Sequence, residues 1–255
     1  MKNLASKKWH LFSSLCIIAV SLLFVFAKTK PNNDLPVTHI NIAAANKSIA
    51  AVHKSNLYDS LKLGSLGLAQ QAFDCAMKGF TSMKEMGKIE NSDIISIIDF
   101  TKSSCKKRLF VIDLKNRKIL FNTYVAHGSK SGKEFAEQFS NIPESNQSSL
   151  GFYETLGTYI GAHGYSLRLQ GIEKGINDNA NKRDIVVHAA DYVNEGLART
   201  RGYIGRSWGC PALPTKLHKP IIDKIKNGTC LFIYSPDRNY LSQSTLLNQQ
   251  YASRS

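Results

Sequence analysis

Acidic side chains are scarce in this chain of 255 residues: 19 Asp and Glu stand against 33 Lys and Arg, for a formal net charge of +14. Such an excess attracts polyanions, such as nucleic acid, anionic lipid or an acidic cell-wall polymer. The sequence lacks a recognition motif for nucleic acid, so we expect no nucleic-acid partner. It also has no internal repeats, which excludes a repeat architecture.

The sequence also lacks cysteines and histidines at the spacings typical of metal ligands. The five cysteines form no CxxC pair, and they have no histidine at a ligand spacing, which excludes a structural zinc site of the usual kind. His127, His163, His188 and Asp191 are too scattered in sequence to form a recognisable metal site. We therefore predict no metal and no cofactor.

The N-terminus predicts export. Lys2, Lys7 and Lys8 precede an apolar segment at 9–27 that contains no charge, which is the order of a secretory signal. The segment is also nearly long enough to span a bilayer, so a cleaved signal and an uncleaved inner-membrane anchor both remain open. We expect a periplasmic or cell-envelope protein in either case.

Four regions follow from composition. They are a signal peptide or membrane anchor at 1–27, a linker at 28–56, a folded domain at 57–238, which the resemblance described below implies to be catalytic, and a polar tail at 239–255. Within the domain, helical periodicity covers 57–87 and 217–225. Strand-like runs occur at 93–100, 108–114, 118–125, 150–160 and 230–234. The polar stretch 129–149 predicts a long loop, either a lid or a plain surface loop. The fold class is therefore mainly β with a few helices.

One cysteine and one histidine have the setting of a catalytic pair. His188 ends the apolar run at 185–187, and Cys210 follows 22 residues later on a glycine-rich turn. A thiol becomes a strong nucleophile only as the thiolate, so it needs a base or a positive charge nearby. A cysteine on a turn also directs its own N–H and that of Gly209 at one point, as an oxyanion hole requires. Arg206 is placed either to activate the thiol or to hold a substrate carboxylate.

The remaining cysteines have simpler interpretations. Cys16 lies in the leader, and Cys230 lies in an apolar run that predicts a buried side chain. A disulfide between Cys75 and Cys105 remains open.

The segment Arg206–Pro211, together with His188, resembles the active-site signature of the bacterial L,D-transpeptidases, the YkuD-like cell-wall enzymes. The match looks closest to the subgroup whose active-site motif ends in Arg-Ser-Trp-Gly-Cys-Pro. Three further segments are similar to that subgroup: VAHGSKSG at 125–132, SSLGFY at 148–153 and GAHGYSLRLQG at 161–171. The resemblance covers roughly residues 57–235. It implies a β-sandwich or open barrel of the L,D-transpeptidase type.

The resemblance also implies a reaction on peptidoglycan stem peptides. Cys210 would attack the carbonyl between the third residue and D-Ala of a tetrapeptide, forming a thioester and releasing D-Ala. His188 would act as base and then as acid, and the Ala189 carbonyl would orient its ring. The backbone of Gly209 and Cys210, with Ser207 beside them, would hold the oxyanion.

Substrate contacts are expected from a further set of residues. They are Arg206, His127, His163, Trp208, Arg168 and Tyr165. Trp208 is either a wall of the pocket or an anchor in the core. It stands where many relatives have a second histidine, so contacts inferred from that histidine do not transfer.

Two other functions compete with L,D-transpeptidation. With water as the acceptor, the protein would be an L,D-carboxypeptidase or another Cys/His cell-wall hydrolase. Without catalysis, it would be an anchored wall-binding protein, which the intact pair of His188 and Cys210 argues against.

Overall fold

The computed structural model describes residues 57–248. The predicted signal or anchor at 1–27, the linker at 28–56 and the last seven residues of the predicted tail lie outside this range. Within 57–248, no helix is long and apolar enough to cross a membrane.

A single mixed sheet of eight strands forms the centre of the domain, in the order β3-β2-β1-β8-β4-β5-β6-β7. The apolar runs explain its middle: β1 and β8 pair in parallel, and nearly all of their residues are buried. The two outermost strands of the β6–β7 end also pair in parallel, whereas the other neighbours are antiparallel. The strands are β1 Ile94–Asp99, β2 Leu109–Asp113, β3 Lys118–Thr123, β4 Gly151–Gly161, β5 Gly164–Gly171, β6 Val186–Ala190, β7 Ala212–Pro214 and β8 Cys230–Tyr234.

The two edges of this sheet meet. After β3 the chain crosses to the opposite edge, where the Ala126 N–H donates to Ala212 O on β7 at 2.9 Å. The Ser207 N–H donates to His127 O at 2.9 Å, and the Ser129 N–H donates to Ser207 O at 2.7 Å. These bonds satisfy backbone groups that an open edge would leave exposed. The sheet is therefore a nearly closed barrel, and the mainly β prediction is confirmed.

Helix α3 (Gln70–Glu85) packs against β1 and β8 through its apolar face. Its approach is close because Gly79 has no side chain: a Cβ there would lie 2.0 Å from Cζ of Phe152. The Phe152 ring in turn stacks on Phe232 of β8, with 4.1 Å between centroids. Gly79 thus lies inside α3, and Gly87 lies beyond the helix end.

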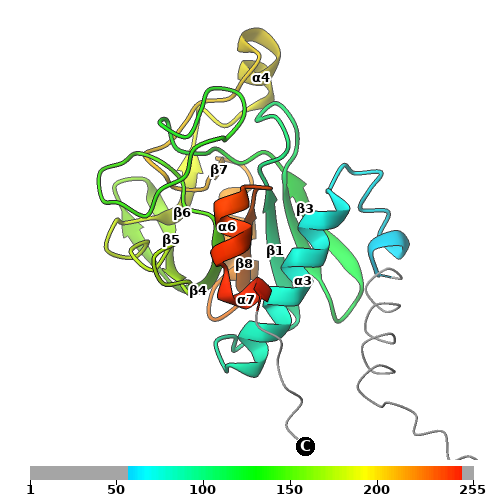
Figure 1. Cartoon of the computed structure of the whole chain (residues 1–255). Helices are drawn as coiled ribbons and strands as arrows, with labels where there is room; N and C mark the ends of the chain where they lie inside the picture. The colour runs from blue at the N-terminus through cyan, green and yellow to red at the C-terminus, as the bar shows by residue number, and fades with distance from the viewer. Residues whose placement is uncertain (1–56, 249–255) are drawn as a thin grey trace, which may run out of the picture. The chain divides into compact units, whose positions relative to one another are not determined.

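Two short helices at the C-terminus, α6 (Arg238–Gln243) and α7 (Thr245–Asn248), lie beside α3 (Figure 1). They bury Tyr240, Leu246 and Leu247. Residues 239–248 of the predicted polar tail are therefore folded against the domain, because three apolar side chains among the polar ones are buried there.

A buried carboxylate ties these helices to the sheet. Glu173 is 2% exposed and accepts hydrogen bonds from the Phe152 N–H of β4 at 2.9 Å, from Tyr240 Oη at 3.3 Å and from Ser244 Oγ. It therefore joins β4 to α6 and to the start of α7.

The helix predicted at 217–225 is α5 (His218–Ile225), and it packs against β5 and β6. The remaining helix, α4 (Glu195–Arg201), was not predicted. It lies in an excursion between β6 and β7 whose neck is closed by the Gly205 N–H, which donates to Tyr192 O at 2.9 Å. Figure 1 shows α4 at one extremity of the domain.

The disulfide between Cys75 and Cys105 is not formed. The Cys105 thiol donates instead to Ala198 O at 3.4 Å. Cys230 is fully buried, as predicted, with its sulfur 3.6 Å from Met83 Sδ.

Candidate active site

The strand pairing at the β6–β7 edge brings His188 and Cys210 to one place. His188 lies in the middle of β6 and is paired in parallel register with Ala212, the first residue of β7. Cys210 precedes β7 by two residues, and the Val186 N–H of β6 points at its sulfur at 3.5 Å. Residues 186 and 188 share one face of the strand. His188 and Cys210, 22 residues apart in sequence, are thus brought together by the pairing of neighbouring strands.

The thiol of Cys210 lies over the beginning of β6. It donates to Asp184 O at 3.5 Å and accepts from the Val186 N–H. Burial raises the pKa of the Cys210 thiol, and the Asp184 carboxylate adds to that rise. The Val186 N–H and the positive charge of Arg183 act in the opposite direction and lower the pKa.

The imidazole of His188 is fixed on both sides. Its Nδ1 lies 2.8 Å from Ala189 O, so Nδ1 carries the ring proton and Nε2 is left as an acceptor. The His163 ring, at the tip of the β4–β5 hairpin, stacks on it with 4.2 Å between centroids and 20° between planes. Burial lowers the pKa of His188, and the charge of a protonated His163 would lower it further. His188 is therefore a neutral imidazole at pH 7.

The turn before the cysteine is held by Ser207. Its Oγ donates to Cys210 O at 2.7 Å and accepts from the Gly209 N–H at 3.1 Å. The Gly209 N–H, expected from the sequence to face an oxyanion, is thus engaged inside the turn. Gly209 has φ +127°, and a Cβ there would lie 2.8 Å from Gln147 O, so only glycine fits.

A cavity of about 640 Å³ opens above these groups. Among the residues expected at the site, six line it: His163, His188, Arg206, Ser207, Trp208 and Cys210. Trp208 is 80% exposed, which makes it a wall of the cavity and not a core anchor. A second cavity of about 440 Å³ shares Arg183 and Trp208 with the first and is also lined by Glu144 and Asn146.

His127 does not reach the cavity, contrary to the prediction. It is fully buried, with Nδ1 2.7 Å from Nη2 of Arg108 and Nε2 3.3 Å from Gly132 O. Arg108 keeps its protons, so the imidazole accepts at Nδ1 and donates at Nε2. The same carbonyl of Gly132 accepts from Arg206 Nη1 at 3.0 Å. His127 therefore supports a residue of the cavity wall from below.

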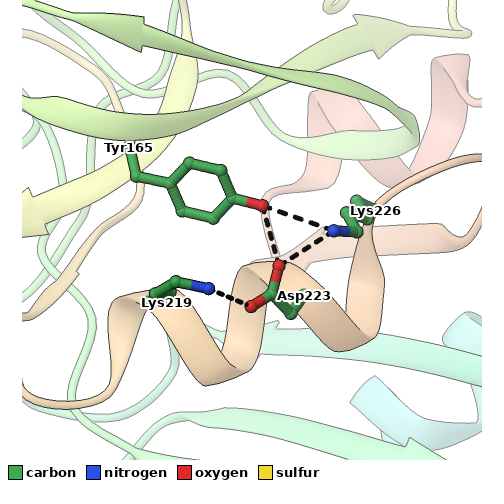
Figure 2. Close-up of polar contacts among 4 residues, drawn as sticks. All are labelled: Tyr165, Lys219, Asp223 and Lys226. Carbon is green, nitrogen blue, oxygen red and sulfur yellow. Dashed lines mark hydrogen bonds and ion pairs between the residues drawn. The ribbon is translucent and has the colours of Figure 1, made fainter.

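Tyr165 and Arg168 also lie outside the cavity lining. Figure 2 shows the Tyr165 hydroxyl directed at α5, where it donates to Asp223 at 2.7 Å. The same carboxylate pairs with Lys219 at 2.7 Å and Lys226 at 2.9 Å, so the cluster holds α5 on β5. The Arg168 guanidinium lies over the Tyr159 ring, 4.1 Å from its centroid. Arg168 therefore acts on the cavity only through Tyr159.

Four polar residues of the lining were not expected from the sequence: Tyr159, Arg183, Asp184 and Tyr192. Arg183 and Asp184 directly precede the apolar run that leads to His188, and that position is the one signal that could have revealed them. No group of three or more His, Cys, Asp or Glu side chains within 57–248 is placed to hold a metal ion.

Comparison with known proteins gives the site a context. Residues 65–234 match the family described as the L,D-transpeptidase catalytic domain. No curated protein sequence matches the chain. Three solved structures illustrate the similarity.

An L,D-transpeptidase from Mycobacterium smegmatis is 12% identical, with a TM-score of 0.35 over 56% of this chain and 59% of that one. The helical cell shape determining protein Pgp2 from Campylobacter jejuni is 14% identical, with a TM-score of 0.41 over 64% and 57%. An L,D-transpeptidase from Xylanimonas cellulosilytica is 13% identical, with a TM-score of 0.32 over 66% and 81%. The match thus spans 59% of the length of the first of these structures.

Proposed function

The chain belongs to the L,D-transpeptidase catalytic domain family, and from this membership we propose that it is an exported cysteine acyltransferase acting on peptidoglycan stem peptides. The observation that carries the proposal is the meeting of Cys210 and His188 at one cavity, on a strand and a turn in fixed register. In this proposal, residues 57–248 form the catalytic domain, and the segment 9–27 directs export or anchors the protein in the inner membrane.

The reaction begins with two neutral groups. Burial favours the thiol of Cys210 and the neutral imidazole of His188 over an ion pair. The thiol therefore turns from Asp184 O to His188 Nε2 and loses its proton as the sulfur attacks. The hydrogen bond that Nδ1–H donates to Ala189 O holds the ring in place and stabilises the imidazolium that forms.

The sulfur forms a bond to the carbonyl carbon between the third residue and the terminal D-Ala. The negative charge moves to the carbonyl oxygen, and in this proposal the Cys210 N–H donates a hydrogen bond to it. His188 then returns the proton to the nitrogen of D-Ala, the C–N bond breaks, and a thioester remains on Cys210.

An amine of a second stem peptide completes the cycle. His188 Nε2 removes a proton from the amine as it attacks the thioester, and the sulfur leaves and is reprotonated. With water in place of the amine, the same steps give a tripeptide. The exposed Trp208 ring, which lines both cavities, offers a surface on which the acceptor stem packs.

Mass spectrometry tests the proposal directly. We expect the full chain, incubated with a disaccharide-tetrapeptide, to release D-Ala and to carry a thioester adduct on Cys210. Cys210→Ala should do neither, whereas Cys105→Ala, which removes a thiol outside both cavities, should behave as the parent. Crosslinked dimers would show transfer, and tripeptide alone would show hydrolysis. A parent protein with neither adduct nor D-Ala release would overturn the proposal.

A further inference from the structure

Arg183 lies at the entrance to β6, and its guanidinium is tied into one segment of the chain. Its Nη1 donates to Ser140 O at 2.7 Å and to Ser149 Oγ at 2.6 Å. Its Nη2 donates to Gln147 O at 2.7 Å and to Ser145 Oγ at 3.1 Å. All four acceptors belong to residues 140–149, the end of the long polar loop expected from the sequence. The side chain thus clamps this segment at four points.

The positive charge of Arg183 is not neutralised. Among residues 57–248, no carboxylate forms an ion pair with it, and its buried Nε has no hydrogen-bond partner. The four outer N–H groups already have acceptors and the unpaired Nε–H is buried, so no N–H of the guanidinium is accessible to a substrate carboxylate. Its electrostatic field is what remains available to the site.

The clamped segment lies directly against the nucleophile turn. Gln147 O accepts from Arg183 and is also the atom that excludes a side chain at Gly209. The neighbouring Ser148 Oγ donates to Gly209 O at 3.1 Å. Arg183 Nη2 itself would lie 3.4 Å from a Cβ at Gly209, and Arg183 lines both cavities. The clamp and the nucleophile turn are therefore one packed unit.

The groups around the Cys210 thiol differ in their effect on its pKa. Burial and the Asp184 carboxylate raise the pKa of Cys210, and Arg183 is the cation that lowers it. Tyr192 lines the same cavity as a neutral phenol, because burial and the nearby Cys210 raise its pKa to about 12. His188 is neutral and stacked under His163. Arg206 also lines the cavity, but its guanidinium is bound to Ser129 O and Gly132 O. Arg183 is thus the fixed positive charge that lowers the pKa of Cys210.

We propose that Arg183 is a positioning residue with two effects: it fixes residues 140–149 against the Gly209–Cys210 turn, and it supplies the field that stabilises the Cys210 thiolate as the proton leaves. The inference deepens the proposed function, since it takes Cys210 as the nucleophile. Its test, however, uses thiol chemistry and needs no peptidoglycan.

The experiment measures the rate of iodoacetamide alkylation at Cys210 against pH, followed by peptide mass mapping so that other cysteines do not contribute. Hydrogen exchange of residues 140–149 is measured on the same full-length proteins. Arg183→Gln removes the charge and the clamp. Arg183→Lys keeps the charge but cannot reach four acceptors. Lys182→Gln removes an exposed positive charge next in sequence and is the matched control.

We expect Arg183→Gln to slow alkylation at pH 7 by on the order of tenfold, to move the midpoint of the pH profile upward, and to speed exchange at 140–149. Arg183→Lys should keep the alkylation rate within about threefold while exchange increases. Lys182→Gln should change neither measurement.

An unchanged pH midpoint in Arg183→Gln, with the protein folded, would overturn the electrostatic effect. Unchanged exchange would overturn the clamp. Should Arg183→Gln not fold, Arg183→Lys provides the test. The proposal is refuted if Arg183→Lys slows alkylation at pH 7 by on the order of tenfold, as loss of the charge is expected to do. It is also refuted if hydrogen exchange at 140–149 in Arg183→Lys equals that of the parent. Peptidoglycan turnover is a separate measurement, so a protein that fails to process tetrapeptide but shows these shifts refutes only the proposed function.

Discussion

His188 and His163 form a stacked pair in which one imidazole is buried and the other is exposed. Burial and the charge of His163 both lower the pKa of His188 below its ordinary value. A base must be neutral to accept a proton, so activity falls when the pH drops through the pKa of His188. The lowered pKa therefore extends activity to more acidic pH than an ordinary histidine would allow.

We predict that His163→Ala moves the acidic limb of the pH–rate profile upward, because it removes both the covering ring and its charge. His163→Phe is the matched control: it keeps the cover but not the charge, so its limb should lie between those of the parent and of His163→Ala. The measurement is D-Ala release, or Cys210 alkylation, from pH 4 to 8. A limb that moves downward in His163→Ala would contradict the prediction.

The conformation and close contacts of Gly209 require glycine at this position. We predict that Gly209→Ala costs about 1–3 kcal/mol in the free energy of unfolding, because φ +127° and the contact with Gln147 O both disfavour a Cβ. It should also abolish thioester formation, since the turn carries Cys210. Gly157→Ala, where a Cβ meets no atom within 4 Å, should change neither property. Urea unfolding and adduct formation measure the two effects, and an active, equally stable Gly209→Ala would refute the argument.

At the residue scale, the sequence is most informative where the chemistry is local. A nucleophile between glycine and proline, and a histidine after an apolar run, are visible in the sequence. His127 was wrongly placed in the pocket because its burial depends on Arg108, 19 residues away. Arg183 was missed because its acceptors lie some 40 residues earlier, in a loop without periodicity.

At the scale of helices and strands, the sequence predicts the elements that have a hydrophobic period and misses those that depend on tertiary contacts. The strands with long apolar runs and the amphipathic helices α3 and α5 were predictable, because burial in a sheet or on its face imposes a period. The helices α6 and α7 were not, because their stability comes from Glu173 and from contact with α3 and β8. Elements of four to six residues depend on tertiary contacts more than on their own propensity.

We predict that Glu173→Ala lowers the free energy of unfolding by about 1–3 kcal/mol, because it leaves the Phe152 N–H and the hydroxyls of Tyr240 and Ser244 without their shared acceptor. Hydrogen exchange should increase first in α6 and α7. Glu85→Gln, at the exposed end of α3, is the control and should leave stability unchanged. A fully stable Glu173→Ala would show that the C-terminal helices are held by apolar contacts alone.

For the molecule as a whole, the buried pair of Arg108 and His127 makes stability depend on pH. Burial and the adjacent guanidinium lower the pKa of His127 to about 3, whereas burial lowers that of Arg108 only to about 9. Below the ordinary histidine pKa of about 6.5, the unfolded chain takes up a proton that the folded chain refuses. Stability is therefore fully present above that pH and is lost as the pH falls toward 3.

We predict a loss approaching about 1.4 kcal/mol for each pH unit below 6.5 from this histidine. His127→Gln should remove that component, because its amide can accept from Arg108 and donate to Gly132 O without titrating. Denaturant unfolding at several pH values from 4 to 7 measures the slope for both proteins. Equal slopes in the two proteins would show that other groups cause the acid sensitivity.

The parallel register of β6 and β7 has a consequence for how such a protein changes over generations. The base and the nucleophile are held together by neighbouring strands, and the chain between them leaves through a neck closed by Tyr192 and Gly205. Residues can be gained or lost around α4, beyond that neck, without moving either reacting group. The number of residues between His188 and Cys210 can therefore change by insertion or deletion at α4. For the same reason, a loop or small domain inserted at α4 would add a new binding surface while the reacting groups keep their positions.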